Sequence, residues 1–154
     1  MKKMILMLCV AATFGISTAF ASLREETVNN KKVMASFQKE FTEAKNVEWF
    51  TDDKAQNYTA NFTIRESKVT AHFDADGNLL NTSRYLNEDQ LPLAVTNRLA
   101  KKYAGQRIEN ITEYQANGEV TYYITERSKD DMITIVKATP DGWLSVYNKF
   151  KQAM

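Results

Sequence analysis

Histidine occurs only once in the chain, at position 72, and a lone imidazole is the first side chain to consider as a general base. His72 alternates with Ala71 and Phe73, so a strand through these residues would place the imidazole on the face opposite to the apolar one. No serine or carboxylate stands at the spacing of a nucleophile elbow or a similar catalytic motif. The sequence therefore predicts no catalytic residue, and a hydrolase that depends on His72 is kept as an alternative.

Two aspartates, Asp74 and Asp76, precede Gly77 and could begin a calcium-binding loop. An EF-hand loop places glycine sixth and glutamate twelfth, whereas here Gly77 is fourth and Tyr85 is twelfth. Asp76-Gly77 is instead typical of a tight turn between two strands. The chain contains five glycines and no glycine-rich phosphate-binding loop, so we expect neither a metal site nor a bound cofactor.

The N-terminal segment has the pattern of a secretory signal peptide. Two lysines precede an apolar run from Met4 to Ile16, and Ala19 and Ala21 supply the small residues that a signal peptidase reads. The pattern predicts a signal peptide over residues 1–21, cleaved near Ala21-Ser22, and a periplasmic or secreted protein. The run is shorter than the roughly 20 residues that span a bilayer, so we expect no membrane insertion after cleavage.

Cleavage would change both the cysteine content and the net charge of the chain. The single cysteine, Cys9, lies in the signal segment, so the mature chain could form no disulfide and no thiolate metal site. Loss of Lys2 and Lys3 would change the formal net charge from +1 to −1. Because the remaining charges are balanced and form no basic cluster, we expect no nucleic-acid partner.

Two amphipathic helices are predicted, over about residues 31–41 and 91–103, because apolar residues recur there at spacings of three and four. Asn30 is suited to cap the first helix. Pro92 suits the first turn of the second helix, and Gly105 suits its end. The apolar stripes are Val33, Met34, Phe37 and Phe41 in the first helix, and Val95, Leu99 and Tyr103 in the second.

After each helix, apolar and polar residues alternate, which predicts strands with one buried face. Asp76-Gly77 and Asp141-Gly142 provide the glycine that a tight hairpin turn requires. The expected strands are 58–64, 69–73 and 78–85 in the first half, and 108–114, 119–127, 132–138 and 143–150 in the second.

The two halves follow the same order of helix, strands and Asp-Gly turn, which predicts an internal duplication. Val33 and Phe37 match Val95 and Leu99 at a shift of 62, and the turns match at a shift of 65. We therefore expect an α+β fold, a tandem duplication of a helix packed on an antiparallel four-stranded meander sheet. The first unit would cover residues 22–86 and the second residues 87–154, and the two sheets could abut or join into one.

Large apolar side chains recur on the outer face of the predicted second unit, where the first unit is polar. If Val136 and Ala138 point to the core, alternation leaves five such residues outside, and exposed apolar patches commonly mark binding surfaces. A register shifted by one residue would instead place the set in the core. The candidate contact residues are Tyr123, Ile133, Ile135, Trp143 and Tyr147.

Several segments resemble the exported PepSY-like family, which is also described as similar to β-lactamase inhibitor proteins. The matching stretches are Phe37 to Trp49, Phe73 to Leu80, and Leu91-Pro92 with the apolar spacing that follows, and with the second half they cover about residues 33–150. The chain departs from the family at Thr42, where proline is frequent, and at Asn110, where a tryptophan would be expected. The resemblance implies helix-over-sheet units in the cell envelope, an open sheet face that in related proteins binds or inhibits enzymes, and no catalytic residues.

These observations predict a non-catalytic exported protein that docks a protein or peptide, or inhibits an envelope enzyme, through its open sheet face. One alternative is a carrier of a small apolar ligand held between the helices and the sheet, with Trp49 and the phenylalanines as its lining. Another is self-association through the same apolar residues.

Overall fold

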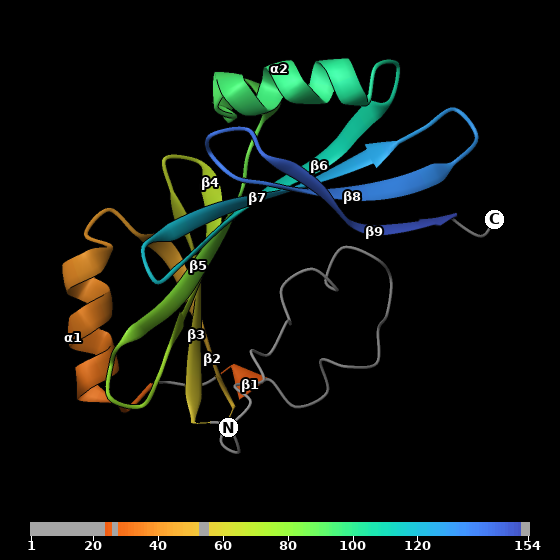
Figure 1. Cartoon of the computed structure of the whole chain (residues 1–154). Coiled ribbons are helices and arrows are strands. Elements are labelled where there is room, and N and C mark those ends of the chain that lie inside the picture. Colours follow the sequence, from red (N-terminus) through yellow and green to blue (C-terminus); the bar gives the residue numbers. More distant parts are fainter. Residues whose placement is uncertain (1–23, 26–27, 53–55, 152–154) are drawn as a thin grey trace, which may run out of the picture.

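The computed structural model describes residues 24–25, 28–52 and 56–151, and within them the chain forms one antiparallel sheet with two α-helices (Figure 1). The predicted signal peptide and its cleavage site lie outside the described residues. Neither helix in the described ranges is long and apolar enough to span a membrane. The elements are β1 Arg24–Glu25, α1 Lys31–Glu40, β2 Lys45–Asp52, β3 Asn57–Ile64, β4 Ser67–Phe73, β5 Leu79–Tyr85, the short 3₁₀ helix η2 Glu88–Gln90, α2 Leu93–Lys102, β6 Arg107–Ala116, β7 Glu119–Arg127, β8 Met132–Ala138 and β9 Leu144–Lys151.

The predicted tandem of two four-stranded meanders is wrong, because the strands belong to a single nine-stranded sheet in sequential order. β5 and β6, on either side of the predicted boundary between the units, pair with each other from Asn81↔Ala116 to Tyr85↔Thr112. This pairing satisfies the backbone groups that two separate sheets would have left along exposed edges. The chain therefore folds around one continuous sheet.

The two helices cover the same face of this sheet. Residues that pair across antiparallel strands lie on one face, and Val69, Arg84, Glu113 and Tyr122 form an unbroken row of such pairs from β4 to β7. Val69 belongs to the core under α1, and Tyr122 belongs to the core under α2. We call the other side of the sheet the open face, defined by the row Thr70, Ser83, Tyr114 and Thr121.

Aromatic rings fill the space between α1 and the sheet. The side chain of Asn30 accepts hydrogen bonds from the backbone of Lys32 and Val33, which confirms it as the helix cap. The ring centroid of Phe37 lies 5.1 Å from those of Trp49 and Phe62. The side chains that were expected to line an apolar ligand site thus pack directly on one another.

A second core lies between α2 and the C-terminal half of the sheet. Val95 and Leu99 on α2 are buried against Ile124 on β7 and Val136 on β8. The spacing of four between the helical residues and the alternation along the strands match the predicted stripes.

The two Asp-Gly turns lie directly against the first turns of the helices. Gly77 and Gly142 have φ angles of 84° and 89°, a conformation that favours glycine. A Cβ atom at Gly77 would lie 2.8 Å from the carbonyl oxygen of Lys32, and one at Gly142 would lie 2.8 Å from that of Ala94. The absence of a side chain at both turns therefore allows each helix to approach its hairpin closely.

Candidate functional site

The five predicted contact residues lie on or beside the C-terminal part of the open face. Val136 and Ala138 belong to the core under α2, so by alternation Ile133 and Ile135 face the other way, as the predicted register requires. Ile135 pairs with Thr125 and Ile133 pairs with Arg127, which extends this face across β7.

These residues differ in how accessible their side chains are to a binding partner. Trp143, directly before β9, is 53% exposed, and Tyr123 and Tyr147 are half-buried. The two tyrosine rings meet edge to face, with their centroids 5.3 Å apart. Ile133 and Ile135 are 0% and 5% exposed, so neither side chain is accessible to a partner.

A bulge in β9 brings Tyr147 to this position. Ile135 pairs with Asn148 and Val136 pairs with Val146, so Tyr147 is an extra residue between the two pairs. A bulge of this kind redirects a side chain and increases the local twist of the strand. It places the Tyr147 ring against Tyr123 of β7, which lies two strands further into the sheet.

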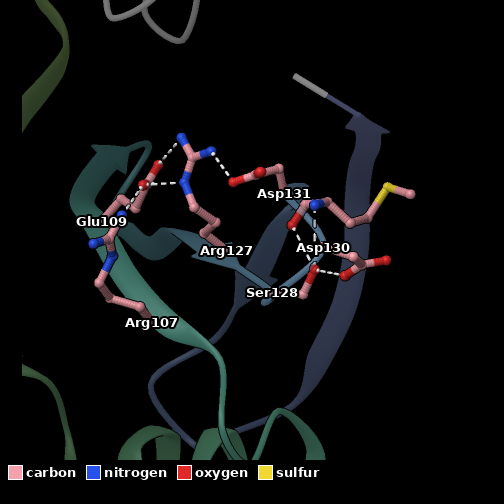
Figure 2. Close-up of polar contacts among 7 residues, drawn as sticks. Arg107, Glu109, Arg127, Ser128, Asp130 and Asp131 are labelled. Atoms are coloured by element: carbon pink, nitrogen blue, oxygen red, sulfur yellow. Dashed lines mark hydrogen bonds and ion pairs between the residues drawn. The ribbon is translucent and has the colours of Figure 1, made fainter. Parts of the chain in front are cut away.

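A network of charged side chains surrounds Arg127 (Figure 2). Arg127 pairs with the buried Ile133 across β7 and β8. The Glu109 carboxylate accepts a hydrogen bond from Nη2 of Arg107 at 2.9 Å and one from Nη2 of Arg127 at 3.1 Å, and Nε of Arg127 donates to it as well. Nη1 of Arg127 donates to Asp131 Oδ1 at 3.2 Å. The hydrogen bond from Arg127 lowers the pKa of Glu109, and the network holds the Arg127 guanidinium in one orientation.

The turn between β7 and β8 is closed by Ser128 (Figure 2). Its backbone N–H donates to the carbonyl oxygen of Met132 at 3.0 Å, and its hydroxyl group donates to the Asp130 carboxylate. That hydrogen bond lowers the pKa of Asp130. The turn thereby fixes Asp131 next to Arg127.

Arg127→Ala should lower the melting temperature of the protein at neutral pH more than Arg107→Ala does. Arg127 makes two hydrogen bonds to Glu109 and one to Asp131, whereas Arg107 makes one to Glu109. Because the folded-state pKa of Glu109 is lowered, its share of the stability is present above the unfolded pKa and is lost as the pH falls. Melting curves recorded from neutral to acidic pH should therefore converge for the wild type and Arg127→Ala. Equal losses for both variants at neutral pH would contradict the assignment.

His72 lies on the polar part of the open face, as its alternation predicts. It pairs with Thr59 and Asn81 in the neighbouring strands, and its Nδ1 atom is 2.9 Å from the Thr59 hydroxyl oxygen. Burial lowers the pKa of the imidazole, which favours the neutral ring at neutral pH. Within the residues that the structure describes, no group of three or more histidine, cysteine, aspartate or glutamate side chains is placed to bind a metal ion.

Glu126, a carboxyl group that is 2% exposed on the helix-covered face, was not predicted from the sequence. It follows Tyr122 and Ile124 in the inward alternation of β7, a signal that could have identified it. Burial is the main cause that raises its pKa to about 7, and the charge of Glu88 adds to the effect. No hydrogen bond or ion pair to this carboxyl group occurs among residues 24–25, 28–52 and 56–151.

Two further polar atoms are buried at the C-terminal end of α2. The Tyr103 hydroxyl oxygen and Gln106 Oε1 have no hydrogen-bond partner in the described part of the chain. Burial raises the pKa of Tyr103, and the nearby Glu126 raises it further. Buried polar atoms in folded proteins normally have partners, so these groups are unusual.

No protein-family model matches the chain, and no curated protein matches it. Solved structures do resemble it. A BLIP-like protein from Bacteroides fragilis is 17% identical with a TM-score of 0.70, and the match covers 84% of this chain and 92% of that one. A DUF2874 family protein from Bacteroides ovatus is 22% identical with a TM-score of 0.67, covering 81% of this chain and 89% of that one.

A third similar structure is a Bacteroides eggerthii protein whose periplasmic location is itself a prediction. It is 21% identical with a TM-score of 0.66, and the match covers 80% of this chain and 89% of that one. At such identities the similarity shows a shared fold. It supports the BLIP-like fold implied by the PepSY-like resemblance, and membership of one particular family stays a prediction.

Proposed function

We propose that the chain is a non-catalytic periplasmic binding protein that docks a protein or peptide on the C-terminal part of its open face. The observation that carries the proposal is a set of three aromatic side chains near the end of the chain. Trp143, directly before β9, is exposed, and Tyr147 within β9 packs edge to face on Tyr123, on the sheet face that neither helix covers. Tryptophan and tyrosine are enriched among the residues that contribute most to protein–protein affinity. The BLIP-like fold of the Bacteroides fragilis protein supports a protein partner.

The arrangement around the aromatic residues is that of a binding surface with a rigid base. Ile133 and Ile135 are buried and hold β8 in place, while Arg127 is fixed at the border by Glu109 and Asp131. A partner would bury an apolar side chain against Trp143 and Tyr147 and direct polar groups to the border. Because the surface is already ordered, little conformational entropy would be lost on binding.

The periplasmic location draws on two observations. The N-terminal residues have the pattern of a signal peptide, and a structure of the same fold from Bacteroides eggerthii is described as a predicted periplasmic protein. Fractionation of cells that express the full chain, followed by mass determination of the mature protein, would test both the compartment and the cleavage near Ala21-Ser22.

Affinity capture from an envelope extract, with the mature chain as bait, tests the binding surface. Trp143→Ser combined with Tyr147→Ser should weaken binding of the partner by roughly a thousandfold, since such residues contribute about 2 kcal/mol each and about 1.4 kcal/mol is tenfold. The melting temperature of this variant should change little, because Trp143 is exposed and Tyr147 is half-buried.

Leu93→Ser is a matched control, because Leu93 is a large apolar residue that is 73% exposed on α2, away from the open face. It should capture the partner as the wild type does. Undiminished capture by the double variant would contradict the proposal. Failure of the double variant to fold would also contradict it, because the residues would then belong to the core.

A further inference from the structure

One lysine on the open face differs from the other lysines of the chain. Lys137 of β8 pairs with Tyr123 of β7 on one side and with Ser145 of β9 on the other. Its neighbours along the strand, Val136 and Ala138, belong to the core under α2, so alternation turns Lys137 to the open face. Of the lysines that the structure describes, Lys137 alone is half-buried, and the others are exposed.

The ammonium group of Lys137 has no partner among residues 24–25, 28–52 and 56–151, because its side chain makes no ion pair and no hydrogen bond there. Two other charged residues of β7 lie on this face. Arg127 is already bound by Glu109 and Asp131. Glu119 begins β7, about 13 Å along the strand from the residue that pairs with Lys137. The positive charge of Lys137 is therefore uncompensated on the described part of this face.

Lys137 stands beside the tyrosine pair of the proposed binding surface. β8 lies between β7 and β9, so the rings of Tyr123 and Tyr147, with their centroids 5.3 Å apart, meet across the strand that carries Lys137. The stem of a lysine is apolar and suits such neighbours, whereas its ammonium group requires water or an anion. A partner that covers the tyrosines removes water from the ammonium group, which is costly unless the partner supplies a negative charge.

We infer that the partner presents an aspartate or glutamate side chain to Lys137, next to an apolar side chain that packs on Tyr123 and Tyr147. The inference rests on the proposed function and adds the chemistry of the partner to it. A carboxylate compensates the ammonium charge at the moment when water leaves, whereas a basic side chain at the same place is repelled. Lys137 is thus the residue that selects acidic over basic partners.

A library of random peptides, displayed at the N-terminus of a phage coat protein and selected on the immobilised mature chain, tests the inference. Displayed in this way, the peptides have no free C-terminal carboxylate, so every carboxylate among the selected sequences is a side chain. The selected peptides should carry aspartate or glutamate beside an apolar residue. Selection on Lys137→Glu should instead yield peptides with lysine or arginine at that place.

Synthetic, amidated copies of the selected peptides give the size of the effect. Lys137→Met keeps most of the apolar stem and removes the charge, and it should weaken binding by about tenfold or more, as expected for a lost charged hydrogen bond. Exchange of the acidic residue of the peptide for its amide should weaken binding to the wild type equally, a test that needs no variant of the protein. Lys149→Met is the matched control, because Lys149 is exposed and pairs with Thr134 on the helix-covered face. It should bind the peptides as the wild type does.

Selected peptides without an acidic residue would overturn the inference, and so would peptides whose binding is unchanged by the amide exchange. If such peptides still lose binding to the variant with Trp143→Ser and Tyr147→Ser, the proposed function survives without the acidic partner. Peptides that bind this double variant as tightly as the wild type would instead contradict the proposed function. The two failures are therefore distinguishable.

Discussion

Replacing Glu126 with glutamine should raise the free energy of unfolding by about 3 kcal/mol at about pH 8.5 and leave it nearly unchanged near pH 4. The carboxyl group is 2% exposed, and its pKa is raised from 4.5 to about 7 in the folded protein. Between these values the folded state binds a proton that the unfolded state has lost. Stability therefore falls as the pH rises from about 4.5 to about 7 and is constant above, and 2.5 pH units at about 1.36 kcal/mol each give the expected difference.

Denaturant unfolding of the wild type and Glu126→Gln across this pH range measures the effect. Glu113→Gln is the control, because Glu113 lies on the same face but is paired with Arg84 at 2.6 Å and is more exposed. The control should not gain stability at alkaline pH. If the wild type and Glu126→Gln lose stability in parallel as the pH rises, the buried acid is not the cause.

Gly142→Ala should lower the free energy of unfolding by about 2 to 4 kcal/mol, and Gly77→Ala should have a similar effect. Both glycines have positive φ angles, which cost an alanine about 1 kcal/mol. In addition, the new Cβ would lie 2.8 Å from a helix carbonyl oxygen, a backbone atom that cannot rotate away. The hairpin or the helix would have to shift, and the packing beneath it would loosen.

Gly118→Ala separates the two contributions to this loss. Gly118 has a φ angle of 77°, but an added Cβ would meet no atom within 4 Å. The control should therefore lose only about 1 kcal/mol, the cost of the backbone conformation. Thermal or denaturant unfolding of the three variants gives the comparison. A loss in Gly142→Ala no larger than that in Gly118→Ala would mean that the contact between turn and helix is not tight.

Most of the helices and strands follow from local signals in the sequence. The periodicity predicted helices over 31–41 and 91–103, and the structure has them at Lys31–Glu40 and Leu93–Lys102. Strand β2 was missed, because Trp49 and Phe50 interrupt the alternation and the register shifts between Lys45 and Glu48. A bulge of this kind hides the period of two that identifies a strand.

The sequence predicted on which face of the sheet the candidate residues lie, but not how deeply each side chain is buried. Alternation placed Ile133 and Ile135 opposite to the core under α2, and the register of β8 agrees. Their burial could not be predicted, because it depends on how the neighbouring strands twist and which side chains lie next to them. Their role, with Trp143, Tyr123 and Tyr147, in binding a partner stays a proposal.

The amino-acid sequence by itself determined the periods of 3.6 and 2, the Asp-Gly turns and the face on which each strand residue lies, because these depend on neighbours a few residues away. Only the tertiary structure decided that β5 and β6 pair and that one sheet forms instead of two. It also decided that Glu126, a carboxyl group in the middle of the sheet, is buried on the helix-covered face. Both outcomes require segments far apart in the chain to meet, and their energies come from contacts that no local pattern records.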